Sequence, residues 1–454
     1  MKRKALALLL TMSTLAMTLT GCAGAAAATA GADQNPGTEV SDDSPDAGTE
    51  DAAAPAGGTT IRLVNNKAEI DVGLHSLAKA YEEKTGITVE IDSIGGGQDT
   101  QAVLKNYYQA GNMPDIFVFE GDTHYETWKD VLTDLTGEAW TEDTEAEYVN
   151  GGKVYGFPTT TEAIGLTYNK AILDKAGIDP KSITGPESMR AAFEKLDSMK
   201  DELGLTSVVG YYTEAANLWW TAGQHLLGTY LDVGLARDDT TYIDLINDGG
   251  KLDMERAKPW AEMVALFNEY TDDNGVSGTY DDQIANFAAG KYAFVTQGSW
   301  IGAAMTGNYA DQYAAAGNFE VGMIPYAFIE GQDTIQTNSP NWWGLYNEGN
   351  VEEAKAFIQW CSENDGGQEI LAKECGCVSP FTSSTHMPED PFAATISDYT
   401  AAGKTSAWHW QGWKEGLAQN VSAVIFQDFA KGSFKSTDEF LETLSKAIEA
   451  YYAQ

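Results

Sequence analysis

The sequence predicts an α/β protein that folds as two lobes. Strand and helix patterns alternate from about residue 60 onward, which is typical of an open sheet with right-handed crossovers. Residues 59–454 are also too many for one hydrophobic core, because a core stops growing beyond about 250–300 residues. The two observations together favour two packed α/β units rather than one.

The first sheet is predicted from three apolar runs of strand length: Ile61–Asn65, Thr88–Ile94 and Asp115–Phe119. A helix is expected over Asp71–Lys84, where apolar residues recur on one face and Gly86 ends the pattern. A second helix is expected from about Thr100 to Gln109, after the Gly95-Gly96-Gly97 turn. This spacing implies parallel pairing of the three strands.

The rest of the chain repeats the alternation. Strands are expected at four further runs: Ile164–Tyr168, Ser207–Tyr211, Tyr292–Thr296 and Phe319–Ile324. Helices are expected between them and near the end of the chain: Pro186–Leu203, Asp253–Tyr270, Val351–Cys361 and Thr437–Tyr452.

Polar or glycine-rich segments follow the first three strands: Asn65–Glu69, Gly95–Gln98 and Phe119–Asp122. Any one of them alone is best interpreted as a turn. In open α/β sheets, however, ligands bind beyond the carboxyl ends of the strands, and these three segments share one rim. The sequence therefore predicts a ligand site at that rim.

The first 22 residues are expected to be a lipoprotein signal peptide. Three basic residues precede the apolar run Ala5–Leu19, which is shorter than the ~20 residues that a membrane-spanning helix needs. Leu19-Thr20-Gly21-Cys22 looks like a bacterial lipobox, which implies that Cys22 is acylated. No other run could span a membrane, so membrane contact is expected through this lipid only.

Residues 23–58 are expected to form a disordered acidic tether. The segment has no aromatic residue and no Lys or Arg, so it cannot bury enough apolar surface to offset its ordering entropy. A lipid and a tether would hold the folded part at the extracellular face of the cytoplasmic membrane, as in a Gram-positive-type bacterium.

The formal net charge of −39 disfavours nucleic acid and anionic lipid headgroups as partners, and a neutral or cationic ligand fits better. Cys361, Cys375 and Cys377 lie in a chain expected outside the membrane, so a disulfide from Cys361 to either of the others is predicted. Cys-x-Cys without a second cluster is a weak metal signal, so no metal or cofactor is expected.

Several segments match one protein family in order along the chain. Gly156–Lys170 (GFPTTTEAIGLTYNK) resembles the first lobe crossing of the extracellular solute-binding proteins of carbohydrate importers. Other segments fall in the order of that family: Gly111–Ile116, Lys153–Gly156, Phe287–Ala293, Gly298–Trp300 and Glu353–Ile358. Each match alone is weak, whereas the shared order is informative.

The resemblance implies a periplasmic-binding-protein-like fold, with a ligand cleft between two lobes joined by hinge crossings. It places the N-terminal lobe at 59–160 and 340–388, and the C-terminal lobe at 161–339 and 389–454. It implies capture of an oligosaccharide by hinge closure and delivery to the transmembrane subunits of an ABC importer. The protein would then be a monomer and not an enzyme.

A sugar site needs flat aromatic platforms and groups that bind hydroxyls. The resemblance implies that Trp300 stacks on the ligand and that Glu162 contacts it, and it matches Phe119 and Asp122 to an aromatic and an acidic contact. Further candidates lie in the strand-end loops, the second lobe and the later crossing: Lys67, Glu69, Glu120, Glu214, Asn217, Trp220, Asn341, Trp342 and Trp410.

Alternatives stay open at this point. A surface glycoside hydrolase would need two carboxyl groups roughly 5–9.5 Å apart, and 67 acidic residues do not rule out such a pair. The same fold could also bind a polyamine, a peptide or an iron chelate. The segment Trp408–Trp413 departs from the family pattern, which indicates either a different sugar or a helix packed by its tryptophans.

Overall fold

The computed structural model describes residues 58–95 and 98–454. The predicted signal peptide, the lipobox cysteine Cys22, nearly all of the predicted tether and the two later glycines of the Gly95-Gly96-Gly97 turn lie outside these residues. Within them, no helix has the length and apolar character needed to span a membrane.

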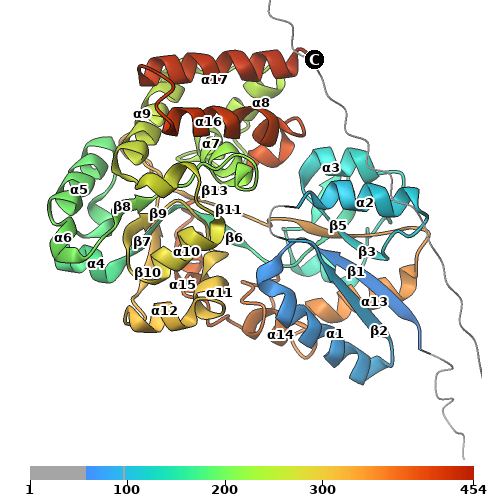
Figure 1. The fold of residues 1–454 in the computed structure, drawn as a ribbon. Helices are drawn as coiled ribbons and strands as arrows, with labels where there is room; N and C mark the ends of the chain where they lie inside the picture. The colour runs from blue at the N-terminus through green and yellow to red at the C-terminus, as the bar shows by residue number, and fades with distance from the viewer. Residues whose placement is uncertain (1–57, 96–97) are drawn as a thin grey trace, which may run out of the picture. The chain divides into compact units, whose positions relative to one another are not determined.

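A six-stranded sheet, ordered β2-β1-β3-β12-β5-β4, forms the first lobe (Figure 1). β1 runs parallel to β2 and β3, as predicted, whereas β12 is antiparallel to both β3 and β5. The strands are β1 Thr60–Asn65, β2 Thr88–Ser93, β3 Ile116–Phe119, β4 Tyr148–Asn150, β5 Lys153–Pro158 and β12 Trp342–Leu345.

Helices cover both faces of this sheet. α1 (Asp71–Thr85), α13 (Val351–Ser362) and α14 (Gln368–Lys373) contribute to one core, and α2 (Thr100–Gln109) and α3 (Gly121–Trp128) to the other. The predicted bounds of α1 and α2 are confirmed to within one residue. α1 ends where Gly86 adopts a left-handed conformation, and α2 begins where the Asp99 side chain accepts from the Ala102 backbone N–H.

The second lobe holds a four-stranded sheet, β10-β7-β9-β8, and a three-stranded sheet, β13-β11-β6. Their strands are β6 Glu162–Ile164, β7 Leu166–Asn169, β8 Ser207–Gly210, β9 Tyr292–Val295, β10 Val321–Ile324, β11 Ile335–Asn338 and β13 Thr405–Ser406. In the four-stranded sheet only β8 and β9 pair in parallel; β7 is antiparallel to β9 and β10. This sheet is therefore mixed.

The α-helices of the second lobe are α4 Lys170–Ala176, α5 Pro186–Ser198, α6 Lys200–Leu203, α7 Leu227–Asp232, α8 Thr241–Asn247, α9 Met254–Tyr270, α10 Tyr280–Ala288, α11 Ile301–Thr306, α12 Ala310–Ala315, α15 Ala393–Ala401, α16 Ala423–Ala430 and α17 Thr437–Tyr452. α17 has the predicted bounds. The predicted helix Pro186–Leu203 is interrupted at Met199, where the backbone leaves the helical region and α5 ends.

The strand predicted at Ile164–Tyr168 is two strands in two different sheets. β6 pairs with β11, and β7 pairs with β9 and β10. The break falls at Gly165, where a Cβ would lie 2.9 Å from the carbonyl oxygen of Ile324. Glycine therefore lets the chain pass close to β10 as it changes sheets.

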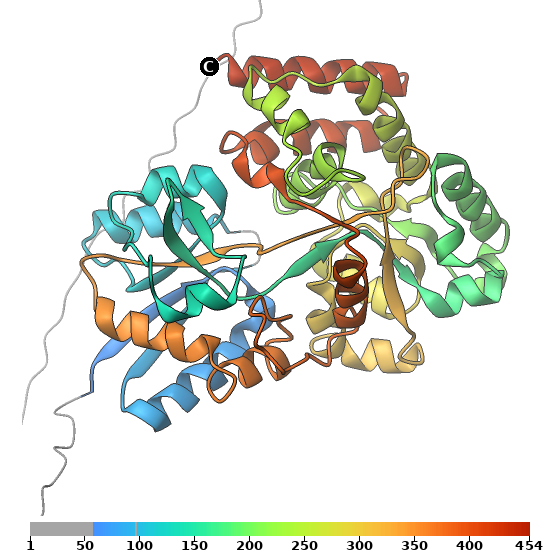
Figure 2. The same cartoon turned by 180° about the vertical axis from the view of Figure 1, so that it is seen from behind.

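The chain passes between the lobes three times. The first crossing (Thr159–Thr161) joins β5 to β6, and the second (Ser339–Asn341) joins β11 to β12. The third (residues 374–392) joins α14 to α15. Figure 2 shows β6 and β11 side by side, in agreement with their pairing. The lobe boundaries given above stay a prediction.

The predicted disulfide is wrong: Cys361, Cys375 and Cys377 are all free and buried. The Cys375 thiol lies 4.0 Å from the carbonyl oxygen of Ile70, and the Cys377 thiol lies 4.0 Å from the carbonyl oxygen of Cys375. The neighbouring Cys377 thiol and burial raise the pKa of Cys375 well above its usual value, which keeps it protonated. These thiols pack in the core of the first lobe.

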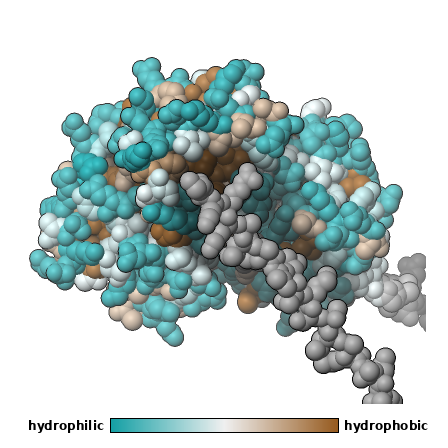
Figure 3. Space-filling view, turned by 45° about the horizontal axis from the view of Figure 1, so that its top comes forward, coloured by the Kyte–Doolittle hydropathy of each residue, from teal (hydrophilic) through white to brown (hydrophobic). Residues whose placement is uncertain are grey.

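The surface in Figure 3 is mainly hydrophilic, and hydrophobic residues occur on it in small areas. Among the described residues, the large hydrophobic side chains that are exposed come from separate elements: Val72, Tyr108, Val149, Met254, Ile329, Met387 and Val424. Single exposed apolar residues of this kind are ordinary on a soluble protein.

Candidate functional site

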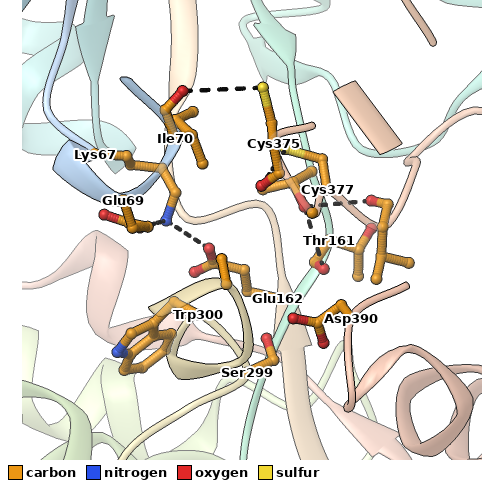
Figure 4. Close-up of a pocket in the computed structure, with 14 residues that line it drawn as sticks. Lys67, Glu69, Ile70, Thr161, Glu162, Ser299, Trp300, Cys375, Cys377 and Asp390 are labelled. Carbon is orange, nitrogen blue, oxygen red and sulfur yellow. Dashed lines mark hydrogen bonds and ion pairs between the residues drawn. The ribbon is translucent and has the colours of Figure 1, made fainter. Parts of the chain in front are cut away.

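A pocket lies where the loop after β1, the first crossing, the start of α11 and the third crossing meet (Figure 4). The space between its atoms is about 350 Å³, open solvent at its mouth included. Its lining comes from both lobes and from the crossings: Lys67, Glu69, Ile70, Thr160, Thr161, Glu162, Ser299, Trp300, Ala303, Cys375, Gly376, Cys377, Val378 and Asp390.

The Lys67 ammonium group pairs with two carboxylates in this pocket. Its Nζ atom lies 2.5 Å from Glu162 Oε1 and 2.7 Å from Glu69 Oε1. Only 12% of the Lys67 side chain and 8% of the Glu162 side chain are exposed, so both charges are largely removed from water. Removing either partner would leave the other charge buried and uncompensated, which is strongly destabilising. It joins the loop after β1 to the first crossing.

The charge state of this pair follows from its surroundings. Burial by itself would lower the pKa of Lys67, but Glu162 and Glu69 outweigh burial and hold the pKa above its usual value. Burial raises the pKa of Glu162, and Lys67 opposes that rise. Lys67 is therefore charged at neutral pH and supplies a positive charge at the pocket wall.

A hydrogen-bonded chain extends the polar group toward the second crossing. Asn66 Nδ2 donates to Glu120 Oε1 over 2.9 Å, and Asn341 Nδ2 donates to Asn66 Oδ1 over 2.7 Å. The Glu120 backbone N–H donates to His124 Nδ1 over 3.0 Å. Burial raises the pKa of Glu120 to about 7 and lowers that of His124 to about 4. The carboxyl group of Glu120 therefore gains or loses its proton near neutral pH.

The free energy of unfolding should fall as the pH rises from 5 to 8, and Glu120→Gln is expected to reduce this fall. The folded state holds the Glu120 proton up to about pH 7, whereas the unfolded state releases it near 4.5, so stability falls as pH rises through this window. We expect the free energy of unfolding of the variant to fall by about 2–3 kcal/mol less than that of the wild type over this range. Urea unfolding at the two pH values measures this difference.

The control for this test is Glu126→Gln, on the exposed face of α3. It should leave the pH dependence of the free energy of unfolding as it is in the wild type. If Glu120→Gln also leaves that dependence unchanged, the carboxyl group of Glu120 does not titrate near neutral pH.

Trp300 lines the pocket from the start of α11. Its ring centroid lies 4.9 Å from that of His225 and 6.1 Å from that of Trp220. Its Nε1 donates to Gln297 Oε1 over 3.0 Å, and Gln283 accepts from Gln297 over 2.7 Å. The indole ring is therefore held in one orientation, with a partly exposed face.

His225 also connects Trp300 to two further tryptophans. The His225 ring lies 5.4 Å from Trp410 and 6.2 Å from Trp408, and those two indoles stack at 5.4 Å. Burial lowers the pKa of His225 to about 3, so its ring is neutral. Trp408 and Trp410 are only 2% and 4% exposed, so they support the aromatic cluster from beneath rather than line the pocket.

Residues 408–415 are anchored in the second lobe, and they are called the 408–415 segment below. His409 Nδ1 lies 2.5 Å from Asp232 Oδ1, and this hydrogen bond raises the pKa of His409. Gln411 Nε2 donates to the carbonyl oxygens of Ser339 and Pro340 over 3.0 and 3.3 Å. The segment is thereby fixed to both the second lobe and the second crossing.

The same segment contacts the first lobe. Thr123 Oγ1 donates to the Trp413 carbonyl oxygen over 2.9 Å, and Lys105 Nζ lies 3.5 Å from Glu415 Oε1. Gly121, with φ of 59°, lies against the Gln411 backbone so closely that a Cβ there would overlap the carbonyl group. The 408–415 segment therefore bridges the two lobes.

Four of the predicted site residues line one pocket: Lys67, Glu69, Glu162 and Trp300. Glu120 and Asn341 lie next to it through Asn66, and Trp220 and Trp410 belong to the aromatic cluster around His225. Of the contacts that the resemblance implied, Glu162 and Trp300 therefore lie in one pocket, and their contacts with a ligand stay a prediction.

The other candidates do not line the pocket. Phe119 and Trp342 pack with Tyr148 in the core of the first lobe, because their strands β3 and β12 are neighbours in the sheet. Asp122 accepts a hydrogen bond from Tyr148 Oη over 2.6 Å. Glu214 accepts from the Asn217 backbone N–H over 2.7 Å, which closes a local loop.

Sequence reasoning missed several residues of the pocket. Asp390 and Val378 lie on the third crossing, and Thr161 and Ser299 directly precede Glu162 and Trp300. The last two could have been found, because each adjoins a predicted contact in the sequence. Asp390 had no such signal, since only the return of the third crossing brings it to the pocket.

Residues 76–403 match the family described as bacterial extracellular solute-binding protein, which covers more than half of the chain. The chain belongs to this family. The predicted solute-binding function and two-lobed α/β fold are therefore confirmed.

Two curated relatives of this solute-binding protein are named for the sugars that they bind. It is 29% identical over 308 residues to the maltooligosaccharide ABC transporter solute-binding lipoprotein of Streptococcus pneumoniae. That match covers 62% of this chain and 68% of the relative. It is 26% identical over 362 residues to the melibiose/raffinose/stachyose-binding protein of Bacillus subtilis. That match covers 75% of this chain and 77% of the relative.

Solved structures share the fold. RafE in complex with raffinose superposes with a TM-score of 0.69 at 19% identity, covering 87% of this chain and all of that one. A Bacillus licheniformis sugar transporter protein in complex with stachyose gives 0.67 at 17% identity, covering 86% and 100%. At such low identity these likenesses show the fold alone.

Proposed function

We propose that this protein captures an oligosaccharide between its lobes and delivers it to the transmembrane subunits of an ABC importer. The observation that carries the proposal is the meeting of Trp300 with Glu162 and Lys67 in one pocket lined by both lobes. An indole face suits the C–H face of a sugar ring, and buried charged groups bind hydroxyls strongly. The sugar-binding relatives support the same ligand class.

The arrangement favours binding over hydrolysis. A general acid or nucleophile must be free to act on the glycosidic bond, whereas Glu162 is held by Lys67 at 2.5 Å. Closure of two lobes completes a set of contacts that each lobe offers only in part, and it excludes water from them. The protein is therefore proposed to be a receptor and not an enzyme.

The remaining features of the proposal concern the anchor and the assembly. Acylation of Cys22 and the tether that follows would keep a monomer at the extracellular face of the cytoplasmic membrane. The named lipoprotein among the relatives supports this placement. Mass spectrometry of the protein purified from membranes tests it, because an unmodified Cys22 would remove the anchor.

A calorimetric screen of neutral oligosaccharides against residues 59–454 tests the ligand class. The same mixtures are assayed for new reducing ends, which a binding protein does not produce. Release of reducing sugar at a catalytic rate would favour the hydrolase instead. Binding of polyamines, peptides or iron chelates in place of saccharides would change the ligand class and keep the fold.

Trp300→Ala is expected to weaken binding of the best saccharide by more than about fivefold, because truncating an aromatic hot spot costs over ~1 kcal/mol. Trp219→Ala is the matched control: Trp219 is half-buried in the same lobe and does not line the pocket. Titration calorimetry of both variants measures the effect. Equal affinities for Trp300→Ala and the wild type would remove the stacking platform from the proposal.

A further inference from the structure

Asp390 is a third acidic side chain in the pocket, beside Glu69 and Glu162, and it lies on the third crossing. It lines the pocket together with Glu162 and Trp300, and its carboxylate lies beside Ser299 in Figure 4. The third crossing therefore contributes to the pocket as well as joining the lobes.

The Asp390 carboxylate is only partly satisfied within the described residues. Oδ1 accepts from the Phe392 backbone N–H over 2.7 Å, and no Lys, Arg or His of residues 58–95 and 98–454 pairs with it. Burial raises the pKa of Asp390 to about 7. A half-buried carboxylate without a cation keeps unused acceptor capacity, so donors from a ligand would stabilise it.

Space for this carboxylate is made by Gly302, two residues after Trp300. A Cβ on Gly302 would overlap Asp390 Oδ2, which shows how closely the carboxylate packs against α11. α11 is the helix that begins directly after Trp300. A glycine at this point thus lets an acceptor pack against α11 in the same pocket that Trp300 lines.

We propose that Asp390 is a specificity-determining contact that accepts hydrogen bonds from hydroxyls of the sugar ring stacked on Trp300. This inference rests on the proposed function and assigns to it a residue of the third crossing. Glu162 and Asp390 would each bind hydroxyls of that ring. A site built to accept from a hydroxyl discriminates strongly against an analogue that lacks it, because the buried acceptor is then left unpaired.

The test uses the best saccharide from the screen and three variants. Asp390→Ala removes the acceptor, and Gly302→Ala displaces it while leaving Asp390 in the sequence. Each is expected to weaken binding by more than about tenfold. Glu389→Gln, an exposed neighbour, is the matched control and should stay within about twofold. Thermal unfolding of every variant shows whether it is folded.

A second readout separates contact from support. Monodeoxy derivatives of the saccharide are titrated against the wild type and Asp390→Ala. The derivative that lacks the hydroxyl bound by Asp390 should bind the wild type more weakly than the parent saccharide does. It should bind Asp390→Ala as tightly as the parent saccharide does. If every deoxy derivative loses equally in both proteins, Asp390 does not read a hydroxyl and the inference is wrong.

Failure of this inference is distinguishable from failure of the proposed function. If Asp390→Ala and Gly302→Ala bind like the wild type while Trp300→Ala is weakened, the role of Asp390 is wrong and the receptor stands. If the folded wild type binds no saccharide, the proposed function fails, and the assignment of Asp390 to a sugar hydroxyl fails with it.

Discussion

Gly121→Ala is expected to abolish tight ligand binding, although residue 121 is outside the pocket. The new methyl group would overlap the carbonyl group of Gln411, which belongs to the 408–415 segment. Backbone atoms cannot move aside by changing rotamer, so α3 and this segment would be pushed apart. Because the segment is anchored in the second lobe, its contacts with the first lobe would be lost, and closure of the lobes over a ligand would be hindered. We expect an affinity loss of about a hundredfold or more, equivalent to ~3 kcal/mol.

Gly111→Ala is the matched control for this variant. Gly111 has φ of 67°, close to the 59° of Gly121, but no atom lies within 4 Å of where its Cβ would be. Both variants therefore pay the left-handed backbone cost of roughly 1–2 kcal/mol, and only Gly121→Ala adds the overlap. Calorimetry gives the affinities, and small-angle scattering with saturating ligand reports closure. Equal affinities for the two alanine variants would contradict a bridging role for the 408–415 segment.

Lys67→Met is expected to destabilise the fold by about 3–5 kcal/mol, the usual cost of removing one partner of a buried ion pair. Glu162 would remain largely buried with Glu69 nearby and without its counter-charge. The double variant Lys67→Met/Glu162→Gln should recover much of that loss, because residue 162 then carries no unpaired charge. Urea unfolding at pH 7 measures all three proteins.

Lys79→Met is the control for this ion pair. Lys79 and Glu83 lie 3.9 Å apart on α1 with 76% and 70% of their side chains exposed, so their pairing contributes at most about 0.5 kcal/mol. If Lys67→Met costs no more than Lys79→Met, or if the double variant gives no recovery, the pair at the pocket wall is solvated and does not join the lobe to the crossing.

Local pattern was sufficient for much of the first lobe. The apolar runs of β1, β2 and β3 and the helical spacing of α1 and α2 lie close together in the chain, and each is ended by a residue with a local effect, such as Gly86 or Asp99. α17 was predicted to the residue because an amphipathic pattern and a capping Ser436 define it. The convergence of Lys67, Glu162 and Trp300 followed from the family resemblance.

Long-range packing explains what was missed. β12 lies between β3 and β5, and this position places Trp342 and Phe119 in the core. Both residues were predicted as ligand contacts from the sequence. Gly165 divides one apolar run between two sheets because the Ile324 carbonyl group approaches it. Neither neighbour is near in sequence, so periodicity carries no information about them.

The sequence by itself determined the two-lobed α/β class, the family and the polar loops at the strand ends, because these depend on composition, period and motif order. The tertiary structure alone decided that the cysteines stay free, that Asp390 reaches the pocket and that Gly121 lies against Gln411. Those features are contacts between residues distant in the chain, and such contacts are set by how the crossings return to the cleft.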